Sequence, residues 1–177
     1  MASAYLSRSV SSSGSNTTAT FSAWVKRAKT SGSDYPRLMS AYQDSGNYTR
    51  ILFRNSDELE AYTYYQGNTN RLVLRTNRLF RDTNAWYHIV VRFDTTQSTA
   101  DDRCRIYVNG VQETSFSSRT NPAQGANLKM NNSGNTYNLG RDGGGGNTFD
   151  GQMAHVHWCD GQSYAPTTFG ETDSNGV

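Results

Sequence analysis

The 177-residue sequence predicts an all-β fold in which two antiparallel sheets pack face to face as a sandwich. Short stretches that alternate apolar and polar residues recur along the chain, and turn residues separate them every ~8 to 12 positions. No stretch shows the 3.6-residue period of an amphipathic helix. Only 34% of the residues are hydrophobic, whereas 16 are glycine and 12% are aromatic, which suits thin sheets with one polar face each. We therefore expect a jelly-roll sandwich of roughly a dozen short strands.

Alternation of residue types places the strands of the first half of the chain. A short edge strand is expected at residues 4–6, and a loop rich in Ser, Thr, Gly and Asn follows it over residues 9–20. Further strands are expected at residues 20–26, 38–42, 48–54, 58–65 and 71–75, with a hairpin across 55–57.

The clearest strand pair lies at residues 84–94 and 104–110. Every second residue is apolar in both, and these residues are Tyr87, Ile89, Val91, Phe93, Cys104, Ile106 and Val108. The polar loop 95–102 joins the two strands, and Asn109-Gly110 signals a tight turn after them. The pair therefore offers one apolar face to a core and one polar face to the outside.

The last third of the chain has weaker strand signals. Strands are expected at residues 111–116, 127–130, 136–140 and 149–158, with a loop at 117–126, a glycine-rich loop at 142–147 and one helical turn at 166–170. In the last strand, Ala154, Val156 and Trp158 are expected on one face, and His155 and His157 on the other.

Charge and cysteine content limit the class of protein. The net charge of +2 is too small to indicate a nucleic-acid-binding protein. Fourteen of the 17 basic residues are Arg, a bias that either reflects base composition or serves anion recognition. Cys104 and Cys159 are expected as free thiols. No apolar run is long enough to span a membrane, so we expect no membrane insertion.

Five short motifs indicate a family. They are Trp24-Val25, Trp86-Tyr-His-Ile-Val-Val91, Ile106-Tyr-Val-Asn-Gly110, Leu139-Gly-Arg141 and Phe149-Asp-Gly151. In this order and spacing they resemble laminin G-like domains of the concanavalin A-like lectin/glucanase superfamily. Asp160-Gly-Gln162 and Phe169-Gly-Glu171 resemble the versions found in structural proteins of marine phages and algal viruses. The resemblance implies one laminin G-like domain over residues 1–177, with residues 1–3 a cloning remnant, excised from a longer protein.

A set of cationic and aromatic side chains is expected to point away from the core. Strand parity assigns to it Arg50, Arg54, Tyr62, Tyr64, Arg71, Arg75, His88, Arg92, Arg105 and Tyr107. Aromatic rings stack on sugars, and guanidinium groups bind hydroxyl, carboxylate or sulfate groups. These side chains are therefore candidate glycan ligands, although exposed strand faces favour Tyr and Arg for purely structural reasons as well.

Three residue groups suggest metal sites. Calcium binds to relatives in this superfamily, and Asp142, Asn147 and Asp150 could supply oxygen ligands, as could Asp94, Asp101 and Asp102. His155, His157 and Cys159 alternate along one strand, but the first and last lie too far apart to share an ion, and a polar outer face is the simpler interpretation. We expect no required cofactor and keep calcium as an alternative.

Catalysis of glycoside hydrolysis requires two carboxylates that face one cleft. Glu58 and Glu60 come nearest to such a pair, but they read more simply as edge charges. We therefore expect a non-catalytic, lectin-like carbohydrate-binding module whose partner is a glycan, in particular an acidic polysaccharide. By resemblance the parent is a virion protein that contacts a host-surface glycan, in the virion or outside the cell. The alternatives are a capsid or fibre module that binds protein neighbours without a sugar site, and a glycoside hydrolase.

Overall fold

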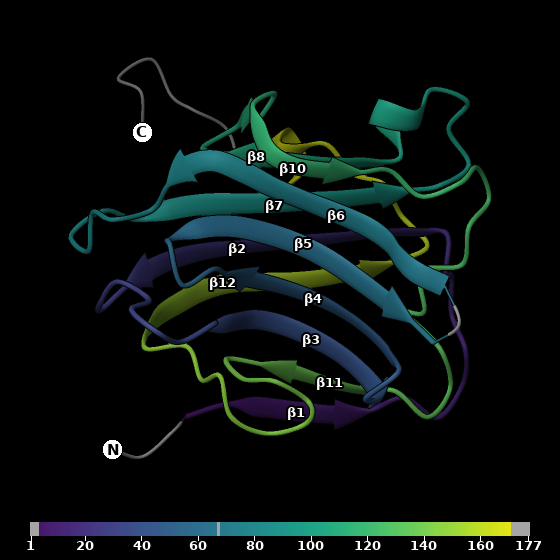
Figure 1. Ribbon diagram of the computed structural model, residues 1–177, viewed down its shortest axis with the longest axis horizontal. Helices are drawn as coiled ribbons and strands as arrows, with labels where there is room; N and C mark the ends of the chain where they lie inside the picture. Colours follow the sequence, from purple (N-terminus) through teal and green to yellow (C-terminus); the bar gives the residue numbers. More distant parts are fainter. Residues whose placement is uncertain (1–3, 67, 171–177) are drawn as a thin grey trace.

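Two antiparallel sheets of seven and five strands form the layers of a sandwich in the computed structural model, which describes residues 4–66 and 68–170, without the side chains of 68–71 (Figure 1). The predicted all-β sandwich of two antiparallel sheets is therefore confirmed. Two single-turn 3₁₀ helices, Ala100–Asp102 and Pro166–Thr168, are the only helical elements in this part of the chain. Neither is long or apolar enough to cross a membrane.

The larger sheet faces the viewer in Figure 1 and has the strand order β1-β11-β3-β4-β5-β6-β10. Its strands are β1 (Leu6–Ser9), β3 (Arg37–Asp44), β4 (Asn47–Phe53), β5 (Glu58–Tyr65), β6 (Asn68–Leu79), β10 (Phe116–Thr120) and β11 (Thr136–Leu139). Strands β3 to β6 follow one another in the chain as a meander, which places four consecutive outward-facing rows of side chains next to each other.

The smaller sheet lies behind, with the order β12-β2-β7-β8-β9 (Figure 1). Its strands are β2 (Thr18–Arg27), β7 (Tyr87–Asp94), β8 (Cys104–Val108), β9 (Val111–Gln112) and β12 (Gly151–Asp160). The expected turn at Asn109-Gly110 joins β8 to β9, and both residues have the positive φ, 50° and 78°, that such a hairpin requires.

The core lies between the two sheets. Inward-facing side chains of both sheets meet there, and those with no exposed surface include Phe21, Val25, Ile51, Phe53, Leu72, Leu74, Ile89, Val91, Phe93, Cys104 and Ile106. The apolar faces predicted for the strands at 84–94 and 104–110 are therefore confirmed. Burial of these side chains is the main force that holds the sheets together.

Two strands expected from the sequence differ in the structure. Residues 127–130 form no strand, although Leu128 and Met130 are fully buried and contribute to the core. Residues 111–120 divide into β9 and β10, which belong to different sheets. The chain crosses between the layers at residues 113–115, a change of sheet that alternation alone does not reveal.

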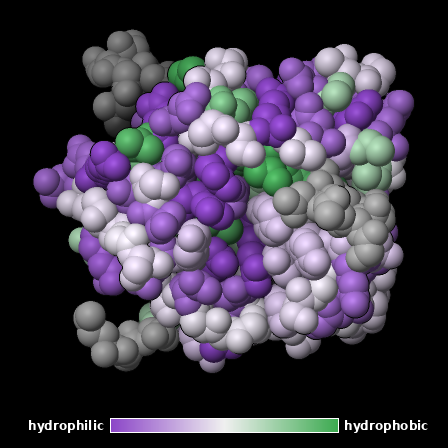
Figure 2. Space-filling model, in the orientation of Figure 1, coloured by the Kyte–Doolittle hydropathy of each residue, from purple (hydrophilic) through white to green (hydrophobic). Residues whose placement is uncertain are grey.

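The segment after β12 crosses the outer face of the smaller sheet. Thr20 Oγ1 donates to the carbonyl of Gln162 at 2.7 Å, and the backbone N–H of Tyr164 donates to Thr20 Oγ1 at 2.9 Å. The ring of Phe169 packs on that of His157, with centroids 5.5 Å apart. Among the described residues no such segment crosses β4 to β6 of the larger sheet (Figure 1), and Figure 2 shows hydrophilic side chains around a hollow near the middle of this face.

Candidate functional site

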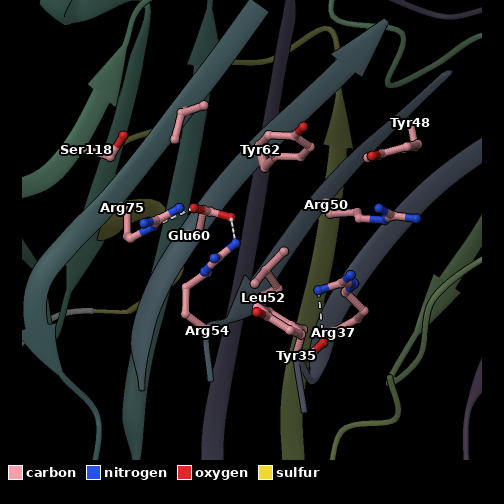
Figure 3. A pocket seen from close by; sticks show the side chains of 11 residues that line it. Tyr35, Arg37, Tyr48, Arg50, Leu52, Arg54, Glu60, Tyr62, Arg75 and Ser118 are labelled. Carbon is pink, nitrogen blue, oxygen red and sulfur yellow. Dashed lines mark hydrogen bonds and ion pairs between the residues drawn. The ribbon is translucent and has the colours of Figure 1, made fainter. Parts of the chain in front are cut away.

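A cavity of about 440 Å³ opens on the outer face of the larger sheet (Figure 3). Four arginines, three tyrosines and a glutamate line it together with Leu52, Val73 and Ser118. The charged and aromatic members are Tyr35, Arg37, Tyr48, Arg50, Arg54, Glu60, Tyr62 and Arg75. These side chains come from β3, β4, β5 and β6 and from the residues that adjoin β3 and β4.

Strand register brings the cavity side chains together. Arg50 of β4 lies opposite Tyr62 of β5, and Leu52 lies opposite Glu60. Glu60 in turn lies opposite Arg75 of β6. Directly paired residues on one face of an antiparallel sheet have Cβ atoms about 5 Å apart, so these side chains form two adjacent rows across the sheet.

Arg50 is held at one end of the cavity by a buried carboxylate. Its guanidinium forms a two-bond fork with Asp142, Nε to Oδ1 at 3.0 Å and Nη2 to Oδ2 at 2.8 Å. Nη2 of Arg37 lies 3.6 Å from the same Oδ2. The Arg50 guanidinium also stacks on the ring of Tyr48 at 3.5 Å.

The glycine-rich loop 142–147 carries Asp142 to this position. Ser40 Oγ of β3 accepts a hydrogen bond from the backbone N–H of Gly143 at 3.3 Å. A Cβ on Gly143 would lie 2.1 Å from Cβ of Tyr42, so only glycine allows the loop to approach β3 so closely. The loop is thus an anchored support for the cavity.

Arg54 and Arg75 are held at the other end of the cavity by Glu60. Arg75 Nε lies 2.7 Å from Oε2 of Glu60, and Arg54 Nη1 lies 3.3 Å from Oε1 (Figure 3). The Glu60 side chain is only 3% exposed, whereas those of Arg54 and Arg75 are 28% and 29% exposed. The carboxylate therefore lies beneath the two guanidinium groups, which face the solvent.

The cavity carries surplus positive charge. Over the described residues, four guanidinium groups stand against the carboxylates of Glu60 and Asp142, an excess of two positive charges. Burial, followed by repulsion from Arg50, lowers the pKa of Arg37 to about 10, so Arg37 is still charged at neutral pH. Its Nε is buried and has no hydrogen-bond partner among the described residues. Such an arrangement favours an incoming anion.

The tyrosines supply neutral hydroxyl groups and ring surface. Burial raises the pKa of Tyr62 to about 12, so its hydroxyl remains protonated over the whole physiological range. Tyr48 stacks on Tyr42 and Tyr64, with centroid distances of 6.4 and 5.4 Å. Tyr64 therefore belongs to a tyrosine row beside the cavity and does not line it.

A laminin G-type model described as the concanavalin A-like lectin/glucanases superfamily matches residues 2–163. The chain belongs to this superfamily. None of the curated proteins matches the sequence. The laminin G-like resemblance of the sequence motifs is thereby confirmed.

Solved structures of other proteins share the fold. A sialidase-derived carbohydrate-binding module from Ruminococcus gnavus, bound to α2,3-sialyllactose, matches with a TM-score of 0.61 at 10% identity, over 93% of this chain and 96% of its own. Domain 4 of an extracellular arabinanase from Geobacillus stearothermophilus, in complex with arabinotriose, matches at 0.59 and 18% identity, over 89% and 66%. Mouse laminin α1 domains LG4-5 match at 0.58 and 13%, over 92% and 43%. At these identities the similarity concerns the fold alone.

The structure divides the predicted ligand residues between two opposite faces. Arg50, Arg54, Tyr62, Tyr64 and Arg75 share the outer face of the larger sheet, and all but Tyr64 line the cavity. The side chain of Arg71 lies outside the described residues.

The remaining four residues, His88, Arg92, Arg105 and Tyr107, are on the outer face of the smaller sheet. The candidate residues therefore divide between two surfaces, because strand parity tells inward from outward positions but does not tell which sheet a strand joins.

The four residues on the smaller sheet already have partners. Arg92 Nε donates to Ser163 Oγ at 2.7 Å, and Arg105 pairs with Asp102. His88 stacks on Trp24, with ring centroids 5.1 Å apart, and Tyr107 is 8% exposed. These contacts hold the crossing segment and the sheet edge.

The three predicted calcium ligands are engaged by other groups of the protein itself. Asp142 pairs with Arg50 and Arg37, as described above, and Asp150 lies 3.9 Å from Nζ of Lys29. The backbone carbonyl of Asn147 accepts a hydrogen bond from the N–H of Arg37 at 3.0 Å. The three residues therefore serve as supports of β3 and of neighbouring loops.

The other two predicted metal groups are also dispersed. Asp101 and Asp102 pair with Arg119 and Arg105. Although burial opposes it, hydrogen bonds from Thr96 and Gln97 lower the pKa of Asp94. Within residues 4–66 and 68–170, no three His, Cys, Asp or Glu side chains converge as metal ligands. The side chains of His155, His157 and Cys159 therefore do not converge either.

Several cavity residues were not predicted from the sequence. Tyr48 shares strand parity with Arg50 and could have been found by the same argument. Strand parity does not find Arg37, because a bulge between Arg37 and Met39 sets the two residues on different faces of the sheet. Tyr35 and Ser118 lie outside the strands predicted from the sequence, and no local pattern marks them.

Proposed function

We propose that this domain is a non-catalytic carbohydrate-binding module that binds an acidic glycan in the cavity of the larger sheet. The observation that carries the proposal is the surplus of two guanidinium charges beside tyrosine rings, in a cavity of about 440 Å³. Guanidinium groups bind carboxylate and sulfate groups through paired hydrogen bonds, and tyrosines contribute apolar surface and a hydroxyl group.

The fold supports a glycan as the ligand class. The Ruminococcus and Geobacillus modules, which share the fold, are bound to sialyllactose and arabinotriose. One of these two ligands is acidic and the other neutral. The arginine content of this chain's own cavity favours the acidic class.

The carboxylates of the cavity support binding without catalysis. A glycosidase needs one carboxyl group to donate a proton and a second one to act as nucleophile or base. Glu60 is buried between Arg54 and Arg75, and its two carboxylate oxygens are paired with these arginines, Oε1 with Arg54 and Oε2 with Arg75. Glu58, the other member of the predicted pair, accepts a hydrogen bond from Ser56 and does not line the cavity.

We place the domain in a virion protein or in another extracellular protein that contacts a host-surface glycan. The support is the resemblance of Asp160-Gly-Gln162 and Phe169-Gly-Glu171 to phage and algal-virus structural proteins. An acidic polysaccharide is a common chemistry of cell surfaces that such a protein would meet.

A glycan array probed with and without calcium tests the proposal. We expect signals on uronate-bearing or sulfated glycans in both conditions. Arg54→Gln should weaken them roughly tenfold, since a charge-assisted contact is lost. Arg92→Gln, which changes a charge on the opposite face, is the matched control and should bind as the parent does. Binding that neither Arg54→Gln nor Arg50→Gln weakens, or a loss in Arg92→Gln alone, would exclude the cavity as the site.

A structural role in a capsid or fibre is the second candidate. It is favoured by β1, an edge strand whose four residues are all exposed, with Leu6 71% exposed. Exposed strand edges pair readily with other chains. If this role holds, the domain should bind no glycan on the array, and Leu6→Lys should abolish assembly with its protein neighbours.

A further inference from the structure

We propose that the cavity binds two anionic groups of one glycan chain at the same time, so that its ligand is a polyanionic glycan with charges on neighbouring sugar residues. This inference rests on the proposed function and adds to it the number and spacing of the charges. It follows from the way the four arginines divide into two pairs.

Each pair is organised around one buried carboxylate. Arg37 and Arg50 share Asp142, which is 5% exposed, and Arg54 and Arg75 share Glu60, which is 2% exposed. One carboxylate neutralises one guanidinium, so each pair retains one surplus positive charge. The surplus of the cavity is thus divided between two positions.

The two carboxylates leave donors for a ligand. A guanidinium group has five N–H donors. Arg54 gives one nitrogen to Glu60, and Arg75 likewise gives one, while both side chains are more than a quarter exposed. Arg50 gives Nε and Nη2 to Asp142 and keeps Nη1 free of any described hydrogen-bond partner. Donors therefore remain at both positions.

The two positions are separated by more than one sugar ring. Arg37 of β3 and Glu60 of β5 both lie opposite Leu52 of β4, which places their Cα atoms two strand spacings, about 10 Å, from each other. Leu52, between them, and Val73 form an apolar floor. Figure 3 shows the pair Arg54 and Arg75 on one side of Leu52 and the pair Arg37 and Arg50 on the other. One acid group can reach one pair, whereas two neighbouring acidic sugars can reach both.

A matched pair of trisaccharides tests this by isothermal titration calorimetry. One trisaccharide is trigalacturonate, and the other carries one galacturonate and two galactose units. The comparison is then repeated with triply and singly sulfated galactose trisaccharides. We expect one of the triply charged probes to bind at least about tenfold more tightly than its singly charged counterpart, because a second charge-assisted contact forms.

Two variants remove the surplus charge at one position each. Arg50→Gln leaves Asp142 with Arg37, and Arg54→Gln leaves Glu60 with Arg75, so neither variant leaves a buried carboxylate without a cationic partner. Each should weaken binding of the triply charged probe about tenfold and of the singly charged probe only about twofold, because a single anion can use the remaining position. Arg92→Gln should change neither affinity. Arg50→Lys, which keeps the charge, should retain the preference if Arg50→Gln does not fold.

Several results would overturn the inference. The cavity would have a single anion position if the triply and singly charged probes bound with affinities within about twofold of each other. The same would follow if only one of the two variants weakened binding. Both results would keep the proposed function. Equal affinity for an oligonucleotide of similar charge would show that the cavity does not distinguish acidic glycans from phosphate chains. Absence of binding to every glycan, charged or neutral, would overturn both proposals together.

Discussion

The buried ion pair between Arg27 and Asp57 shows how single charged residues are held in this fold. Arg27 Nη2 lies 2.8 Å from Oδ1 of Asp57, and the two side chains are 1% and 7% exposed. The same carboxylate accepts hydrogen bonds from the backbone N–H of Ser31 at 2.8 Å and from Arg81 Nε at 3.2 Å. Burial opposes ionisation, but these donors outweigh it and lower the pKa of Asp57.

Asp57→Asn should lower the free energy of unfolding by about 3 kcal/mol at pH 7, because it leaves the Arg27 charge buried without its partner. Since the folded-state pKa of Asp57 is depressed, its contribution is present above the pKa of the unfolded chain, about 3.9, and is lost as the pH falls further. The difference between parent and variant should therefore shrink below about pH 4. Urea denaturation at several pH values measures it.

Asp34→Asn is the matched control for that prediction. Asp34 is 59% exposed and lies 3.9 Å from Lys29, so its removal should change the free energy of unfolding by less than about 0.5 kcal/mol. A comparable loss in both variants would mean that the buried position of the Arg27–Asp57 pair does not matter. A difference that stays constant down to pH 2 would contradict the proposed titration of Asp57.

Sequence reasoning found the cavity residues that regular strand geometry positions. Arg50, Arg54, Tyr62 and Arg75 were predicted from parity because each lies at an outward position relative to a buried neighbour. The position of Arg37 depends on a bulge in β3, which strand parity does not predict. The supporting role of Asp142 could not be predicted either, since its contact with Arg50 spans 92 positions in the sequence.

Among the elements, β12 departs from a regular strand. A bulge lies between Ala154 and His157 in its pairing with β2, and His155 within it has a φ of 47°. The prediction that Ala154 shares a face with Val156 and Trp158 is therefore wrong. Ala154 pairs with Trp24 on the outer face, whereas Val156 and Trp158 pack against the core. The one extra residue in the bulge reverses the face of the sheet on which each preceding residue of the strand lies.

Replacement of His155 by glycine should leave stability within about 1 kcal/mol of the parent or raise it, because relief of the positive φ offsets the added freedom of the unfolded chain. His157→Gly is the matched control two residues away, in regular pairing with Ser22. It should cost at least about 1 kcal/mol, because it adds freedom to the unfolded chain and also removes the contact with the ring of Phe169. Thermal unfolding of both variants measures the contrast, and an equal loss in both would argue against the bulge.

At the scale of the whole molecule, the sequence predicted two layers but not the distribution of strands between them. Alternation of apolar residues identifies the buried face of a strand, and it does so equally well in either sheet. The sheet of each strand depends on contacts between distant parts of the chain, such as the pairing of β11 with both β1 and β3. For that reason the four arginines of the cavity converge, while Arg92 and Arg105 lie on the opposite side of the sandwich.

The sandwich should also fold without metal or disulfide. Its core joins both sheets through fully buried apolar side chains, and Cys104 lies among them as a free thiol, while Cys159 is also free. Burial raises the pKa of both thiols, which disfavours the reactive thiolate form. We therefore expect reductant and chelator each to leave the melting temperature within a few degrees, since 1 kcal/mol corresponds to about 2 to 4 °C for a chain of this length. A larger drop with chelator, reversed by calcium alone, would reinstate Asp142, Asn147 and Asp150 as metal ligands. It would also mean that the charge balance of the cavity includes a bound cation.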